Sequence, residues 1–198
     1  MPVLTVVGGP NGSGKSSIIR SVELEGRDDL LDADAIAKRI NPANPRRAAV
    51  AAAREVILGI REYLKSHQSF AIETTLSSRS TLATMRQAQA HGFIVRLVYV
   101  CLDNPERSIQ RVRERVAQGG HDVPDADIRR RYNRSLLNLP AALLLVHQAI
   151  VFDNSEAEPR KVLETQFGTM VWRTNNEPAW VTRALETISS KRPGPALK

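Results

Sequence analysis

Residues 9–16 read Gly-Pro-Asn-Gly-Ser-Gly-Lys-Ser, a segment with three glycines that ends in a lysine and a serine. Glycines let several backbone N–H groups point into one small space, because no side chain blocks the approach and positive φ angles are accessible. Such a nest binds the phosphate chain of a nucleotide, with Lys15 at the β- and γ-phosphates and the Ser16 hydroxyl on Mg²⁺. The pattern is complete, follows an apolar run at residues 3–7 and precedes a predicted helix, whose N-terminal dipole also favours phosphate. It therefore predicts a site for ATP or GTP with Mg²⁺. The predicted nucleotide-binding residues are Gly9, Pro10, Asn11, Gly12, Ser13, Gly14, Lys15, Ser16 and Ser17.

A nucleotide site alone does not separate a kinase from an ATPase, a GTPase or a motor. An ABC-type ATPase would need an LSGGQ-like signature, and a GTPase would need an Asn-Lys-x-Asp motif; the sequence contains neither. It does contain acidic residues at predicted strand ends and a later arginine-rich segment. In-line phosphoryl transfer needs a group that positions the acceptor hydroxyl and accepts its proton, together with cations around the phosphates. The pattern therefore favours a kinase that acts on a small acceptor.

The net charge of +7 favours anionic partners, and eight arginines lie between Arg107 and Arg134. With only three Tyr and two Trp in the chain, a stacking surface for RNA is less favoured than a phosphate-binding site. A polynucleotide or RNA kinase, and a nucleotide-dependent regulator without an acceptor, stay open as alternatives.

The chain has one cysteine, Cys101, so it has no internal disulfide framework, and its first residues show no signal-peptide pattern. The longest apolar stretch, residues 141–152, is interrupted by His147 and Gln148 and is shorter than the ~20 residues that a membrane span needs. We expect a cytoplasmic protein without a membrane span.

Apolar runs alternate with segments of helical periodicity, which is typical of a parallel sheet with crossover helices. We expect an α/β fold: a doubly wound, mainly parallel five-stranded sheet flanked by helices, in a single domain at residues 1–190. An arginine-rich helical lid is expected at about 115–135, and a disordered tail at 191–198. The expected strands cover residues 3–7, 30–31, 70–72, 93–102 and 149–152. The expected helices cover residues 15–25, 35 to about 40, 46–66, 80–91, 105–118, 125–138 and 177–189.

Several segments, in this order, resemble the zeta-toxin family of P-loop kinases, including short bacterial proteins labelled predicted ABC-type ATPases. They are residues 8–16, 31–34 (Leu-Asp-Ala-Asp), 70–76 (Phe-Ala-Ile-Glu-Thr-Thr-Leu), 119–124 (Gly-Gly-His-Asp-Val-Pro) and 128–132 (Ile-Arg-Arg-Arg-Tyr). The resemblance implies a kinase that phosphorylates a hydroxyl, which in the best-known members belongs to a UDP-activated amino sugar. It also implies an antitoxin protein as a partner.

The acidic residues receive roles partly from this resemblance. Asp34 matches the second acid of the family's Asp-x-Asp pattern and is the candidate base; alternatively it only caps the following helix. Asp32 is a candidate for orienting a Mg²⁺-bound water. By resemblance Glu73 and Thr75 hold the acceptor, while the alternative for Glu73 is a Mg²⁺-associated acid without substrate contact.

One position departs from the toxins. Two residues after Thr75, where they carry an arginine that holds the substrate, this chain has Ser77, and Arg79 is the candidate replacement.

The arginines can be sorted by helical geometry. At 100° per residue, Arg107, Arg111 and Arg115 share one face, opposite a face of Ile109, Val112 and Val116. Planar guanidinium groups suit a lid over phosphates, because they can bridge phosphate oxygens. The predicted catalytic arginines are Arg115, Arg130 and Arg131, whereas Arg107 and Arg134 are expected to face solvent.

Asn154 follows the last predicted strand, so it either contacts the nucleotide base or forms a turn. His121 lies in the expected lid loop and is interpreted as a hydrogen-bonding loop residue. The histidines and Cys101 show no metal-ligand spacing, so Mg²⁺ bound with the nucleotide is the only expected metal. The identity of the acceptor, the choice of ATP over GTP and the oligomeric state stay open.

Overall fold

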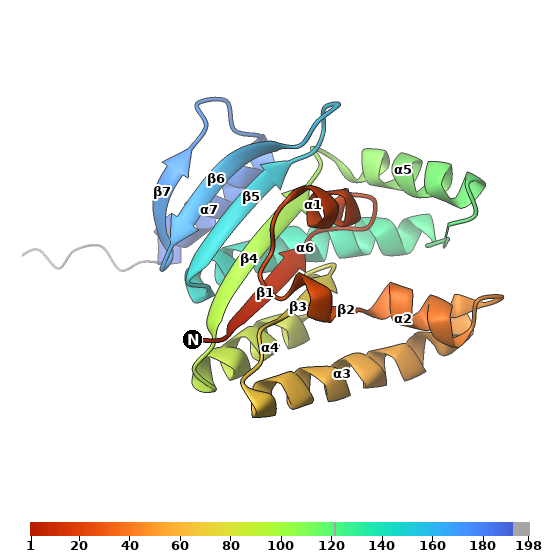
Figure 1. The fold of residues 1–198 in the computed structure, drawn as a ribbon. Helices are drawn as coiled ribbons and strands as arrows, with labels where there is room; N and C mark the ends of the chain where they lie inside the picture. Colours follow the sequence, from red (N-terminus) through yellow and green to blue (C-terminus); the bar gives the residue numbers. More distant parts are fainter. Residues whose placement is uncertain (121, 192–198) are drawn as a thin grey trace, which may run out of the picture.

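The computed structural model describes residues 1–120 and 122–191, so the expectations for His121 and for residues 192–198 lie outside the described residues. The described chain forms one sheet in the strand order β2-β3-β1-β4-β5-β6-β7, with helices on both faces (Figure 1). The strands are β1 (Val3–Gly8), β2 (Leu30–Asp32), β3 (Phe70–Thr74), β4 (Ile94–Cys101), β5 (Gln148–Asp153), β6 (Arg160–Gln166) and β7 (Thr169–Arg173). The helices are α1 (Lys15–Ser21), α2 (Ala33–Ile40), α3 (Ala49–Ser66), α4 (Arg79–Ala90), α5 (Pro105–Ala117), α6 (Asp125–Leu145) and α7 (Ala179–Lys191). Two 3₁₀ turns, η1 (Arg27–Asp29) and η2 (Pro45–Ala48), precede β2 and α3.

The five predicted strands are confirmed, and they pair in parallel. The expectation of five strands in total is wrong, because β6 and β7 extend the sheet as antiparallel strands beyond β5. They form a hairpin whose turn contains Phe167 and Gly168, both with positive φ (49° and 70°). Every residue of β7 is exposed, so β7 carries no apolar pattern that would mark it as a strand.

The two faces of the sheet carry different helices. Helices α3, α4, α6 and α7 pack on one face, where Leu64, Met85, Leu139 and Trp180 belong to the main apolar core. Helix α1 lies on the other face, with Ile18 packed against strand β4 (Figure 1). None of the described helices is long and apolar enough to cross a lipid bilayer.

Two helices end elsewhere than expected. Helix α1 stops at Ser21 instead of residue 25, because Val22 is extended. Helix α6 continues past residue 138 to Leu145 and contains Pro140. A proline inside a helix removes one backbone hydrogen bond, but Pro140 and its neighbour Leu139 are buried. Packing therefore holds the helix through a residue that sequence rules treat as a stop.

Candidate functional site

The glycine loop joins β1 to α1 and has a backbone that only glycine fits. Gly9 has a φ of 147°, and a Cβ atom there would lie 2.0 Å from the carbonyl oxygen of Val100. Gly14 has a φ of 96° and would place a Cβ 2.1 Å from the side-chain nitrogen of Asn154. Both glycines are therefore required by close packing and by a positive φ, not only by an incoming ligand.

Lys15 is the first residue of α1, and its ammonium group is buried at the base of the loop. Its Nζ donates a hydrogen bond to the carbonyl oxygen of Pro10 at 3.1 Å and lies 3.6 Å from Oε1 of Glu73. Burial lowers the pKa of Lys15, because it disfavours the charged form, and the negative charge of Glu73 opposes that shift. Lys15 is thus a buried cation whose nearby anionic partner is a carboxylate.

Strand register explains why the carboxylates gather here. Asp32 of β2 is paired with Glu73 of β3, which is in turn paired with Val7 of β1. Since parallel strands end at the same sheet edge, Asp32, Glu73 and the glycine loop lie side by side. Ser16 Oγ donates to Glu73 Oε2 at 3.5 Å. Burial raises the pKa of Glu73, Lys15 opposes this, and the charges of Asp32 and Asp34 add to it.

Asp32 and Asp34 differ in role although they lie two residues apart. Asp32 is the N-cap of α2, and its Oδ1 accepts a hydrogen bond from the backbone N–H of Asp34 at 2.8 Å. The alternative that Asp34 caps the helix is therefore wrong. The Asp34 side chain is exposed in the first turn of α2 and lines a cleft.

This cleft, which we call the α2–α6 cleft, has a volume of about 350 Å³ and lies between α2, η2 and the start of α6. Asp34, Arg46, Asp122 and Arg131 are among the residues that line it. Arg46 Nη2 donates to Oδ2 of Asp122 at 2.7 Å and to its carbonyl oxygen at 3.0 Å, so η2 is tied to the loop before α6. Neither Arg46 nor Asp122 was singled out from the sequence, and at a sequence separation of 76 no local pattern would have paired them.

The three predicted catalytic arginines lie in different places. Arg131 Nη1 donates to Oδ1 of Asn11 in the glycine loop at 3.2 Å, so Arg131 links that loop to the α2–α6 cleft. Arg115 lines an adjoining hollow of about 490 Å³ that also contains Asp34. Arg130 forms an ion pair with Asp127 at 3.0 Å, one turn earlier on α6.

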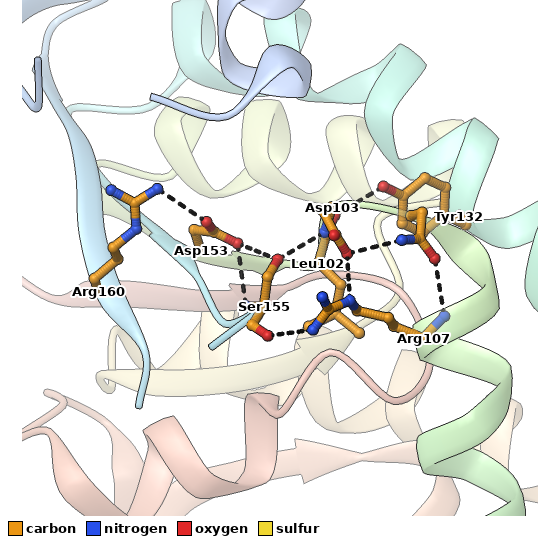
Figure 2. A network of polar contacts seen from close by, with 8 residues as sticks. Leu102, Asp103, Arg107, Tyr132, Asp153, Ser155 and Arg160 are labelled. Carbon is orange, nitrogen blue, oxygen red and sulfur yellow. Dashed lines mark hydrogen bonds and ion pairs between the residues drawn. The ribbon is translucent and has the colours of Figure 1, made fainter. Parts of the chain in front are cut away.

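The two arginines expected in solvent behave differently. Arg134 is exposed, as predicted. Arg107 is not simply solvated: its Nη1 donates to the carbonyl oxygen of Ser155 at 2.6 Å, and its Nε lies 3.1 Å from Oδ1 of Asp103 (Figure 2). Arg107 is nevertheless exposed, as predicted, with 47% of its side chain accessible. It makes these contacts because it lies in the first turn of α5, next to the loop after β5.

The remaining predicted site residues lie around this region. The hydroxyl groups of Thr75 and Ser77 are 2.7 Å apart, and Arg79 is exposed at the first residue of α4. Among the described residues, Arg79 does not line the α2–α6 cleft. Ser17 is exposed in the first turn of α1. Asn154 is buried, and its side-chain nitrogen donates to the carbonyl oxygen of Ser13 at 2.8 Å.

Comparison with known proteins shows the family to which this chain belongs. A family model described as AAA domain, AAA_33, matches residues 4–135, more than half of the chain. The chain belongs to this AAA domain family. The matched residues of this chain include the glycine loop, the acidic residues Asp32, Asp34 and Glu73, and the three predicted catalytic arginines. They do not include Asn154. An uncharacterized protein of Haemophilus influenzae (strain ATCC 51907 / DSM 11121 / KW20 / Rd) is 38% identical over 124 residues, which are 63% of this chain and 88% of that protein.

Solved structures share the fold of this AAA domain protein at low sequence identity. The complex AvrRxo1-ORF1:-ORF2 with ATP has a TM-score of 0.67 at 13% identity, covering 100% of this chain and 66% of that chain. This chain thus spans just under two thirds of that relative. The PezAT chromosomal toxin-antitoxin system of Streptococcus pneumoniae has a TM-score of 0.58 at 13% identity, covering 96% and 85%. The Pnkp1/Rnl/Hen1 RNA repair complex has a TM-score of 0.52 at 17% identity, covering 90% and 50%.

Proposed function

We propose that this protein is an ATP-dependent kinase that transfers the γ-phosphoryl group to a hydroxyl of a small acceptor. The observation that carries the proposal is the 3.6 Å approach of Lys15 to Glu73, at a sheet edge where Asp32 is in register with Glu73. Asp34 lies two residues after Asp32, in the first turn of α2, and lines the α2–α6 cleft. A cation for the phosphates and a carboxylate base for the acceptor thus lie at one end of the sheet.

The residues at the glycine loop fit a nucleotide with Mg²⁺. Ser16 Oγ and Glu73 Oε2 lie 3.5 Å apart, and hydroxyl and carboxylate oxygens are the ligands that Mg²⁺ prefers. Bound Mg²⁺ would supply positive charge at the phosphate oxygens. The Asp32 carboxylate, whose Oδ1 accepts the Asp34 N–H, would orient a metal-bound water.

In the proposed transfer, separate residues accept the proton and offset the charge. The acceptor oxygen forms a bond to the γ-phosphorus while the bond from that phosphorus to the leaving oxygen of ADP breaks. The Asp34 carboxylate takes the proton of the acceptor hydroxyl. Lys15 and Arg131 offset the negative charge on the transferring group, since both reach the glycine loop.

A finer proposal concerns the acceptor and the partner. The segments that resemble the zeta toxins, together with the fold shared with PezAT, support a nucleotide-sugar acceptor in the α2–α6 cleft and an antitoxin protein as partner. We place this activity in the cytoplasm as a single-domain enzyme, with α5 and α6 as the lid over the phosphates.

An RNA kinase is the second candidate. It is favoured by the net charge of +7 and by the fold shared with the RNA repair complex. If the protein is an RNA kinase, its affinity for RNA should fall steeply with added salt, because contacts with RNA phosphates release counterions. A small-molecule kinase predicts no such binding.

The experiment that tests the proposal uses purified protein, Mg²⁺ and ATP labelled at the γ-phosphate. It is incubated with a bacterial metabolite extract and, separately, with 5′-hydroxyl oligoribonucleotides. The proposal predicts a new labelled small molecule by mass spectrometry, absent with the Lys15→Ala variant and present with Lys65→Ala, an exposed lysine of α3. Label on the oligoribonucleotide alone would favour the second candidate, and label on neither would contradict both.

A further inference from the structure

Asn154 directly follows β5 and is a buried polar residue, with 7% of its surface exposed. Its backbone N–H donates to the carbonyl oxygen of Cys101 at 2.9 Å, which fixes it against the end of β4. Its side-chain Nδ2 donates to the carbonyl oxygen of Ser13 at 2.8 Å. The Asn154 amide is therefore already committed to the glycine loop, 141 residues away in the sequence.

The contact lies at the point where the glycine loop becomes α1. Gly14 is the N-cap of α1, and a Cβ built on it would lie 2.1 Å from Asn154 Nδ2. The carbonyl of Ser13 and the N–H of Gly14 belong to the same peptide plane, and in a trans peptide they point in opposite directions. Holding the Ser13 carbonyl toward Asn154 therefore turns the Gly14 N–H to the other side.

A polar network holds the residues on both sides of Asn154 (Figure 2). Asp153 is 4% exposed; its Oδ1 accepts a hydrogen bond from Ser155 Oγ at 2.6 Å, and its Oδ2 accepts one from Arg160 Nη2 at 3.2 Å. Ser155 Oγ also accepts from the backbone N–H of Asp103 at 2.8 Å. Arg160 belongs to β6, so part of this support lies outside the residues 4–135 that the family model matches.

We propose that Asn154 is a positioning residue for the glycine loop, which acts on phosphate binding through the Ser13 carbonyl and not through the nucleotide base. The inference rests on the nucleotide-binding part of the proposed function. It replaces the sequence-based interpretation of Asn154 as a base contact or a turn residue. It also gives the segment from β5 to β6 a role in phosphate binding.

The test is the Asn154→Asp variant, which keeps the size of the side chain but can set an acceptor oxygen against the Ser13 carbonyl. Dissociation constants are measured by calorimetry for the Mg²⁺ complexes of tripolyphosphate, ATP and GTP. Tripolyphosphate has no base, so it reports the loop alone. For each probe that binds the wild type, we expect the variant to have about tenfold lower affinity, by the same factor for all of them. A loss of about tenfold is the usual cost of losing a buried hydrogen bond.

Two further variants complete the experiment. Asn175→Asp introduces the same charge at an exposed residue beyond β7 and should bind all probes like the wild type. Asn154→Ala removes the donor without adding a charge, and it replaces the aspartate variant if the latter melts below the assay temperature. Melting temperatures separate a local effect on the loop from general unfolding.

The outcomes separate the alternatives. A loss confined to one nucleotide, with tripolyphosphate binding unchanged, would mean that Asn154 contacts the base and would overturn the proposal. Unchanged affinities for all three probes would overturn it too. A wild-type protein that binds none of the probes would instead overturn the nucleotide site itself, and the role of Asn154 with it.

Discussion

The Nζ of Lys15 and the Oε1 of Glu73 lie 3.6 Å apart, and their side chains are only 8% and 15% exposed. Burial disfavours both charges, so it lowers the pKa of Lys15 and raises that of Glu73, while each charge partly offsets the cost of the other. An incoming polyphosphate would give Lys15 a second anionic partner. This buried pair therefore links the stability of the protein to the site that we assign to phosphate binding.

The first prediction concerns pH. The pKa of Glu73 is raised above its ordinary value of 4.5, so between that value and the raised one the folded state binds more protons than the unfolded state. The contribution of Glu73 to the free energy of unfolding must then decrease as pH rises through this window. Denaturant titrations between pH 4 and 7 should show this decrease in the free energy of unfolding for the wild type. The Glu73→Gln variant should not show it. Parallel pH profiles for the two proteins would show that burial does not shift this carboxyl group.

The second prediction concerns the helix cap. Removing the Asp32 side chain in Asp32→Ala leaves an N–H group at the start of α2 without its acceptor. We expect the free energy of unfolding to fall by about 1 kcal/mol, measured by urea denaturation. Asp32→Asn is the matched control, since asparagine caps equally well.

The same control separates the two roles of Asp32. If its carboxylate also orients a metal-bound water, Asp32→Asn should keep wild-type stability and transfer phosphate more slowly. If Asp32→Asn transfers phosphate at the wild-type rate, Asp32 only caps α2 and does not orient a metal-bound water.

The third prediction concerns Arg131, whose Nη1 lies 3.2 Å from Asn11 Oδ1. If Arg131 offsets charge on the transferring group, Arg131→Gln should slow phosphoryl transfer on the order of 10²-fold or more, with a smaller change in ATP affinity. Arg134→Gln, one turn further along α6 at an exposed position, should transfer at the wild-type rate. Equal rates in the two variants would remove Arg131 from the site.

Much of the site could be predicted from the sequence because its parts are local patterns. The spacing of Gly14, Lys15 and Ser16 after an apolar strand predicts the phosphate loop without tertiary information. Asp32 and Glu73 were predicted at strand ends, and parallel strands necessarily end at one edge of the sheet.

The missing parts depend on contacts that leave no trace in local sequence. Asn154 bonds a backbone carbonyl, an acceptor that every residue has, so nothing in the sequence marks Ser13 as its partner. Arg46 and Asp122 meet only when η2 and the loop before α6 approach each other. Strand β7 was missed because it is exposed along its whole length and shows no buried face.

The most direct test of the kinase assignment is the rate of γ-phosphoryl transfer by Asp34→Asn, measured together with its dissociation constant for ATP. Asp28→Asn, a change at an exposed aspartate before β2, is the control. If Asp34 takes the proton of the acceptor, the rate falls about 10²-fold or more while ATP binds as in the wild type. An Asp34→Asn protein that transfers phosphate as fast as the wild type would contradict the account.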